Sequence, residues 1–346
     1  MKRLLITFAL LTMIAVPARA TEISAPPAPE AAQKYMPKET TSFGEDLWYI
    51  VKQAGADIFP SVADAVKSCL GVVVSSILCS ILQSYTLTDR KLTDLAGSVS
   101  AGILMLKPVN TFVGLGVETV SQITEYGKML LPVMTTALAA EGGATTAASL
   151  YTTTAFFDNV LSTMISKLLI PLMYVFLCLA VAQGTIGEGI VGSLKQFLKW
   201  LMTWGLKILL YIFISYIGVT GIVNGTTDAI ALKAAKLTIS GAVPVVGGIM
   251  AEASETVLVS AQIVKNSVGT YGLVAVIALT IGPFLQIAIQ YLLMKLTAGL
   301  CTAFPCGRMS EVMKDFAAGM GLMLAMTGAV CLLFLISLVC FMRGVG

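Results

Sequence analysis

The chain has 346 residues, of which 57% are hydrophobic and only 12% are charged. Soluble domains carry roughly 25% charged residues, so this composition excludes an ordinary soluble protein. It predicts an all-α, polytopic integral membrane protein. Such a protein is embedded in the lipid bilayer, which we therefore expect to be one of its partners. The 22 Lys and Arg and 19 Asp and Glu nearly balance. The basic residues are scattered singly and form no stripe for nucleic acid, so we expect no nucleic-acid partner.

The first twenty residues (1–20) have the three parts of a secretory signal peptide. Lys2 and Arg3 supply the positive region, residues 4–16 form the apolar core, and Ala18-Arg19-Ala20 is a small-x-small cleavage site. An uncleaved first anchor is the alternative, but this apolar run is shorter than the about 20 residues that a spanning helix needs. We therefore predict a cleaved signal peptide.

Residues 21–68 are predicted to be an exported N-terminal segment. The segment contains the Pro- and Ala-rich stretch APPAPEAAQKYMPKETT, which is typical of a flexible chain. From Phe43 onward the apolar residues have helical spacing, with Trp48 and Tyr49 among them. This pattern predicts an amphipathic helix at the membrane interface. The remaining residues, 69–346, are predicted to form one polytopic helical membrane domain.

Apolar runs near the length of a bilayer crossing predict six spans in this domain. They lie at about Cys69–Tyr85, Leu95–Val117, Leu161–Gln183, Gly205–Val223, Tyr271–Leu293 and Ala317–Phe341. Lys107, inside the second span, is expected to snorkel to the interface or to pair with an acidic residue.

An exported N-terminus followed by an even number of spans puts three loops inside the cell. These loops are Thr86–Asp94, Gly184–Trp204 and Lys295–Phe316. All three carry basic residues, which agrees with the positive-inside rule. The second loop is predicted to be an interfacial helix anchored by Trp200 and Trp204.

Two external stretches, residues 130–154 and 242–267, are apolar but contain a proline. Each precedes a predicted span that contains another proline, and the two prolines have the same separation in both cases. This layout suggests a parallel internal repeat. The residues at which we expect helices to break are Pro132, Pro171, Pro244, Gly247, Gly248 and Pro283.

The second of these stretches carries a narrow polar stripe on an apolar helix. At 100° per residue, the side chains of Glu252, Glu255, Gln262 and Asn266 fall within about 80° of one another. Carboxylates in hydrocarbon cost several kcal/mol unless they meet water, a cation or a partner. The stripe could therefore line a water-filled conduit, dock on another protein chain, or lie flat at the exported interface. The docked or flat helix is the simpler interpretation, because membrane anchoring alone explains such a stripe.

Motifs of catalysis are absent from the sequence. It contains no His, no P-loop pattern, no G-x-S-x-G and no zinc-ligand spacing. Cys301 and Cys306 are close in sequence, but no further ligand lies nearby, which makes them a poor zinc signal. We predict no catalytic residue, no metal site and no cofactor, and hence no enzyme.

Residues 220–300 carry the pattern of a known family. The matching elements, in order and spacing, are Asp228, Lys233, Lys236, Pro244-Val245-Val246-Gly247, Glu252, Glu255, Lys265-Asn266, Val268-Gly269, Gly272 and Pro283. In these elements the chain resembles the stage III sporulation protein AE family. The signal peptide, the LLPVM and KLLIPL segments and the last hydrophobic helix extend the similarity over most of the mature chain.

The resemblance implies a role in endospore formation. Family members are polytopic proteins of the mother-cell membrane around the engulfed forespore. They belong to a channel or secretion-like complex with the other stage III sporulation A proteins and the forespore's stage II sporulation protein Q, and that complex sustains late forespore gene expression. The family has no assigned catalytic residues.

The residues alone leave two other functions open. One is a small-solute transporter with a parallel repeat, and the other is a polytopic subunit of a conjugative secretion system. The sequence is also compatible with a homo-oligomer.

Overall fold

The computed structural model describes residues 24–37, 43–85, 90–186, 189–242, 247–304 and 307–343; for residues 218–261 it describes the path of the helices alone. These residues form helices and no strand, which confirms the all-α class. The predicted signal peptide lies outside the described residues. The helices are α2 (Glu30–Gln33), α3 (Phe43–Asp57), α4 (Phe59–Tyr85), α5 (Arg90–Ala140), α6 (Ala144–Met164), α7 (Ile170–Ile186), α8 (Ile190–Ala242), α9 (Gly247–Cys301) and α10 (Gly307–Arg343), with a π turn, η1 (Ile165–Leu169), between α6 and α7.

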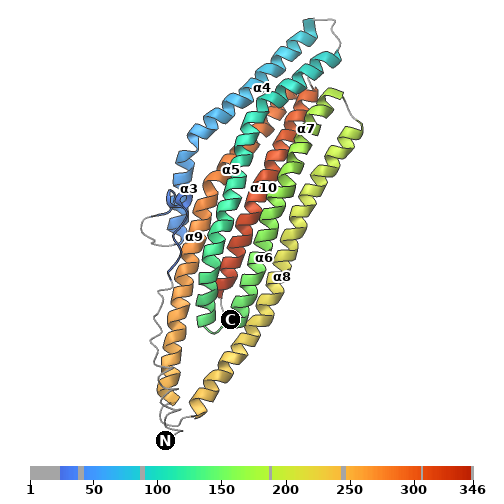
Figure 1. Ribbon diagram of the computed structural model, residues 1–346. Helices are drawn as coiled ribbons and strands as arrows, with labels where there is room; N and C mark the ends of the chain where they lie inside the picture. Colours follow the sequence, from blue (N-terminus) through green and yellow to red (C-terminus); the bar gives the residue numbers. More distant parts are fainter. Residues whose placement is uncertain are drawn as a thin grey trace.

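The helices form an elongated bundle in which α5, α8 and α10 run in one direction and α6, α7 and α9 run in the other (Figure 1). One end contains the last residues of α4, α7 and α9 and the first residues of α5, α8 and α10. We call it the Arg308 end. The opposite end contains the α5–α6 turn, the end of α8, the start of α9 and the end of α10, and we call it the Glu141 end. The three loops predicted to be internal thus share the Arg308 end.

Helix α10 occupies the centre of the bundle, where it contacts every long helix from α5 to α9 (Figure 1). Its aromatic side chains Phe316, Phe334 and Phe341 are fully buried. A helix that is apolar on all sides is expected in such a position. The apolar run in the last predicted span therefore reflects burial in protein as well as contact with lipid.

The number of predicted spans is confirmed, but their predicted bounds are too short. Six helical stretches of the described residues are long and apolar enough to cross a membrane: Val62–Leu82, Leu92–Ala140, Ala144–Thr185, Ile190–Ile217, Gln262–Cys301 and Arg308–Arg343. Helices α5, α8 and α9 have 51, 53 and 55 residues. At about 1.5 Å per residue each is more than twice as long as the roughly 30 Å of hydrocarbon in a bilayer.

Most of the expected proline breaks do not occur. Pro132 lies inside α5 and Pro283 inside α9, because packing along a long helix outweighs the one backbone hydrogen bond that a proline removes. Pro171 lies inside α7, directly after the π turn. That wider turn gives room to the proline ring, which would otherwise meet the carbonyl group one turn earlier.

The second interrupted stretch differs from the first in its relation to the helix ends. Helix α9 begins at Gly247, and Gly248 is its second residue, while Pro244 lies outside the described residues. Helix α5 continues to Ala140, well beyond Pro132, whereas α8 ends before Pro244. When Pro132 and Pro171 are aligned with Pro244 and Pro283, the end of α5 therefore does not coincide with the end of α8. The internal repeat stays a prediction.

The predicted interfacial helix around Trp200 is the first part of the continuous helix α8. Phe197, Trp200 and Trp204 form a row on its exposed side, with ring centroids 6.1 and 6.2 Å apart. Aromatic residues favour the level of the lipid headgroups. This row is compatible with the predicted anchoring role, but the prediction of a separate interfacial helix was wrong.

Besides Phe156 on α6 and Ile212 and Ile214 farther along α8, the bundle has a large group of exposed apolar side chains near the Arg308 end. We call them the apolar belt: Leu70, Val74, Ile77, Leu78, Ile81 and Leu82 on α4; Leu92, Leu95, Ile103, Leu104 and Leu106 on α5; Phe197, Trp200, Leu201, Trp204 and Ile208 on α8; and Leu292, Leu296 and Leu300 on α9. On α4, the distance from Lys67 to Tyr85 is about 27 Å along the helix, which is close to the thickness of the hydrocarbon layer. We expect the belt to be a surface that meets lipid.

The exposed face of α5 becomes polar beyond the belt. Toward the Glu141 end it exposes Glu118, Ser121, Glu125, Lys128 and Thr136. A polar face opposite a buried apolar face is typical of a helix in water. We therefore expect this part of α5 to lie outside the hydrocarbon layer.

The N-terminal segment packs on the bundle, contrary to the expected flexible chain. Ala28, Ala32 and Tyr35 are buried, and the backbone N–H of Ala28 donates a hydrogen bond to the hydroxyl of Tyr271 on α9 (3.2 Å). The predicted amphipathic helix corresponds to α3, which exposes Trp48 and Tyr49. Buried alanines at a spacing of four residues hold this segment against α9.

Glycines let the long helices approach closely, as small residues do in membrane bundles. A Cβ atom built at Gly127 on α5 would lie 2.0 Å from the ring of Phe334 on α10. At Gly114, on the same helix, an added Cβ would meet no atom within 4 Å. Gly127 is therefore a packing requirement, whereas Gly114 is not.

We expect Gly127→Ala to destabilise the protein by about 1–3 kcal/mol, the usual range for overpacking a core. Gly114→Ala is the matched control and should leave stability unchanged or raise it by up to about 1 kcal/mol, because alanine favours a helix more than glycine does. Thermal unfolding of both variants in detergent measures the difference. Equal melting temperatures for the two variants would contradict the close α5–α10 contact.

A second prediction concerns the ion pair between Lys34 and Asp57 (2.6 Å), which joins the N-terminal segment to α3. The hydrogen bond from Lys34 lowers the pKa of Asp57 and raises that of Lys34. The pKa of Asp57 is lower in the folded protein than in the unfolded chain. The pair therefore stabilises the docked segment at pH values above the ordinary Asp pKa of about 3.9, and this stabilisation is lost as the pH falls below that value. Burial raises the pKa of the neighbouring Tyr35, which stays neutral throughout this range.

Amide hydrogen exchange of residues 24–37, corrected for its intrinsic rate, tests this pH dependence. We expect faster exchange below about pH 4 in the unmodified protein. Asp57→Asn should exchange faster at neutral pH and show no further change on acidification. Identical pH profiles for the two proteins would reject a role for this pair.

Candidate functional site

The predicted polar stripe lies on the part of α9 that extends beyond the apolar belt. Gln262 and Asn266 are exposed on the surface of the bundle, one turn apart. The side chains of Glu252 and Glu255 lie outside the described part of the structure. The structure therefore places half of the stripe, and that half faces outward from the bundle.

Lys265, next to the stripe, points into the protein instead. Its side chain is 1% exposed and forms an ion pair with Glu141, which is 14% exposed. Glu141 belongs to the turn between α5 and α6, so the pair fastens α9 to that turn. Sequence patterns give no sign of this contact, because 124 residues separate the two partners.

The turn that presents Glu141 is a Schellman motif at the end of α5. The N–H of Gly143 donates to the carbonyl of Leu138 (3.1 Å), and that of Gly142 donates to Ala139 (3.0 Å). Gly142 has a φ of 102°, a conformation that favours glycine. The Gly-Gly pair, and not Pro132, is thus the signal that ends α5.

Close helix contacts exclude water from the inner side of the Lys265–Glu141 pair. An added Cβ at Gly269 would lie 2.5 Å from Met342 of α10, and one at Gly272 would lie 2.6 Å from Leu130 of α5. Both glycines share the buried side of α9 with Lys265. A buried pair of this kind contributes little net stability, but removing one partner is costly because the other charge is left unpaired.

Two further polar contacts connect helices inside the bundle. The hydroxyl of Thr124 on α5 donates to Asp158 on α6 (3.2 Å), and the hydroxyl of Thr154 on α6 donates to Ser337 on α10 (2.9 Å). All four side chains are buried. Such hydrogen bonds fix the neighbours of α6 and its rotation about its own axis.

At the Arg308 end, ion pairs join the three loops that the sequence predicts to be internal. Arg308 lies 3.6 Å from the carboxylate of Asp94 and donates to the backbone carbonyl of Thr185 (3.4 Å). Lys195 of α8 pairs with Asp315 of α10. These contacts give the basic residues of this end a structural role.

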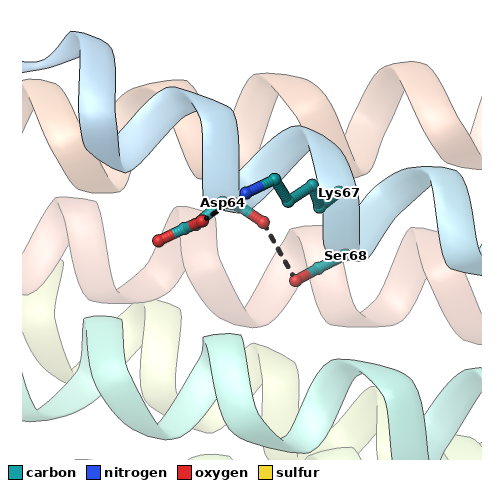
Figure 2. A network of polar contacts seen from close by, with 3 residues as sticks. All are labelled: Asp64, Lys67 and Ser68. Atoms are coloured by element: carbon teal, nitrogen blue, oxygen red, sulfur yellow. Dashed lines mark hydrogen bonds and ion pairs between the residues drawn. The ribbon is translucent and has the colours of Figure 1, made fainter.

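A polar groove runs between α4 and α5 where the apolar belt ends. Its volume is about 830 Å³, and its polar lining consists of Asp64, Lys67, Ser68, Lys107, Asn110, Thr111, Glu118 and Gln286. On the α4 wall, Lys67 pairs with Asp64 (3.3 Å), and the hydroxyl of Ser68 donates to the backbone carbonyl of Asp64 (3.1 Å; Figure 2). Lys107 is exposed, as expected for a snorkelling lysine.

The chemistry available at these places is binding and packing. In the part of the chain that the structure describes, no group of three or more metal-ligating side chains is found. Among the described residues, five ion pairs hold the segments together, and other charged side chains, such as Glu125 and Lys128, are exposed on the surface. The arrangement suits contacts with other chains and with lipid.

The bundle defines the protein as a multi-pass α-helical membrane protein. The profile of the stage III sporulation protein AE family matches residues 33–344, and the chain belongs to that family. Stage III sporulation protein AE of Bacillus subtilis (strain 168) is 24% identical over 302 residues, which cover 86% of this chain and 75% of the relative. No solved structure matches the chain. Membership in the family supports a role in sporulation.

The Lys265–Glu141 pair can be tested by a double-mutant cycle. We expect Lys265→Met to destabilise the protein by about 3–5 kcal/mol, because it leaves Glu141 unpaired in a mostly buried position. Adding Glu141→Gln should restore part of that loss. The exposed neighbour is the control, and Asn266→Ala should change stability by no more than about 0.5 kcal/mol.

Thermal unfolding in detergent gives the stabilities that this cycle needs, which are those of the unmodified protein, the two single variants and the double variant. If the double variant is as unstable as the sum of the two single variants, the two side chains do not interact and the fastening of α9 to the turn is wrong.

Proposed function

We propose that this chain is a non-enzymatic membrane core subunit of the complex that links mother cell and forespore during sporulation. The observation that carries the proposal is the family match over residues 33–344. The proposed location is the mother-cell membrane around the forespore. The proposed partners are the other stage III sporulation A proteins and, from the forespore, stage II sporulation protein Q.

The shape of the bundle supports a bridging role. Helices α5, α6, α8 and α9 extend beyond the apolar belt, and the exposed face of α5 is polar there. A rigid projection of this kind offers a surface to proteins in the space outside the membrane. In our proposal the Glu141 end faces that space, and the Arg308 end faces the mother-cell cytoplasm.

The stripe is proposed to bind a partner. Gln262 and Asn266 are exposed on the outside of the bundle, while α10 fills its centre. Any conduit would therefore form between chains, with Glu252, Glu255, Gln262 and Asn266 facing a neighbouring subunit. This arrangement satisfies the polar side chains without exposing them to hydrocarbon.

Deletion of the gene in its own host tests the role in sporulation. We expect engulfment to be completed, the forespore to shrink and a late forespore reporter to stay silent. Normal mature spores would reject the proposed role.

Photo-crosslinking in sporulating cells tests the partner separately. A benzoylphenylalanine residue at Asn266 should form adducts with another stage III sporulation A protein. The same residue at Leu296, which is exposed in the apolar belt, is the control and should not. Equal adducts from both positions would show that the stripe is not the partner-binding surface.

A further inference from the structure

The polar groove between α4 and α5 lies at the level where lipid headgroups meet the protein. Leu70 of α4 and Leu104 and Leu106 of α5 belong to the apolar belt and are exposed within one turn of Lys67 and Lys107. On the other side of the groove, Glu118 begins the water-exposed face of α5. The groove therefore spans the boundary between hydrocarbon and water.

The α5 wall of the groove presents donors for an anionic group. Lys107 and Asn110 are three residues apart, so their side chains share one face of the helix. The hydroxyl of Thr111 already donates to the backbone carbonyl of Lys107 (3.1 Å). Lys107 forms no ion pair with any residue that the structure describes. One turn further, Gly114 leaves open space, because an added Cβ would meet nothing within 4 Å.

An apolar groove lies beside this wall, between α5 and α7. Its volume is about 290 Å³, and α5 lines it with Val99, Gly102, Ile103, Leu106 and Val109, while α7 contributes Tyr174, Leu177, Cys178 and Val181, and α10 contributes Phe316. Ile103 and Leu106 precede Lys107 by four residues and by one. Since Ile103 lies one helical turn before Lys107, a chain of methylene groups in this groove would end about one turn from Lys107.

We propose that the two grooves together bind one phospholipid, with its phosphate at Lys107 and Asn110 and one acyl chain between α5 and α7. The neighbouring grooves match the two parts of an amphiphile: a cation with an amide donor for the phosphate, and an apolar channel for the hydrocarbon. Asp64 and Glu118 line the same polar groove. Their negative charges disfavour a free phosphate that has no hydrocarbon to hold it in place.

A lipid bound in this way would connect several helices, which a freely diffusing lipid of the bilayer does not do. It would contact α5, α7 and α10, and its headgroup would occupy the gap between α4 and α5. Since Lys107 has no ion-pair partner among the described residues, the phosphate would supply its counter-charge, while Lys67 on α4 stays paired with Asp64.

Native mass spectrometry of the full-length protein, delipidated in detergent, tests the proposal. The probe is 1-palmitoyl-2-oleoyl-phosphatidylglycerol. We expect one lipid to bind preferentially, and Lys107→Gln to weaken its binding about tenfold, the usual effect of losing a charge-assisted hydrogen bond. Lys128→Gln is the matched control, since Lys128 is exposed on α5 beyond the belt.

A second variant and a competitor make the assignment specific. Leu106→Ser should also weaken binding, because it places a hydroxyl in the apolar groove. Glycerol 3-phosphate, which has the phosphate but no acyl chain, should not displace the lipid. Equal binding by the Lys107→Gln and Lys128→Gln variants would overturn the site, and full displacement by glycerol 3-phosphate would overturn its assignment to a phospholipid.

Discussion

The difference between helix length and bilayer thickness determines the rest of this structure. A helix of more than 50 residues cannot be contained in about 30 Å of hydrocarbon without a large excess. The excess of α5, α8 and α9 lies on one side, toward the Glu141 end, where α5 exposes polar residues. Part of this excess packs around the central helix α10, and the end of α8 and the start of α9 continue beyond the last residues of α10 (Figure 1). The membrane and the space outside it are therefore connected by uninterrupted helices.

Continuous helices determine how polar groups are used. Inside the bundle, hydroxyl groups donate to Asp158 and Ser337, and Lys265 pairs with Glu141. These contacts join helices that are far apart in sequence. They fix the register between helices, which apolar packing alone specifies only loosely. Polar groups that are not needed for this purpose, such as Gln262 and Asn266, face outward and are available to partners.

The sequence was sufficient to predict the fold class and the number of spans, because apolar runs and the hydrocarbon thickness are directly related. It was not sufficient to predict the extent of the helices. The sequence around Pro132 and Pro283 suggests that a helix breaks at each of them. However, each proline removes only one backbone hydrogen bond from a helix whose packing supports it along its length. The actual end of α5 depends on the left-handed conformation of Gly142, a signal present in the sequence as Glu-Gly-Gly.

At the candidate site, too, the sequence predicts local features but not those that depend on tertiary contacts. The exposed position of Gln262 and Asn266 agrees with their helical spacing, since the angle between them is a local property. The neighbouring Lys265 could not be assigned in this way, because its partner Glu141 is brought near only by the α5–α6 turn. The groove at Lys107 also depends on tertiary structure, because one wall comes from α4 and the other from α5.

The central place of α10 has a consequence for biogenesis. Helices α5 to α9 leave the ribosome before the helix that they all contact. Until α10 is inserted, the side chains that pack against it, such as Leu177 beside Gly319, lack that contact. The helices made earlier already contact one another, and the insertion of α10 supplies the central contacts that complete the bundle.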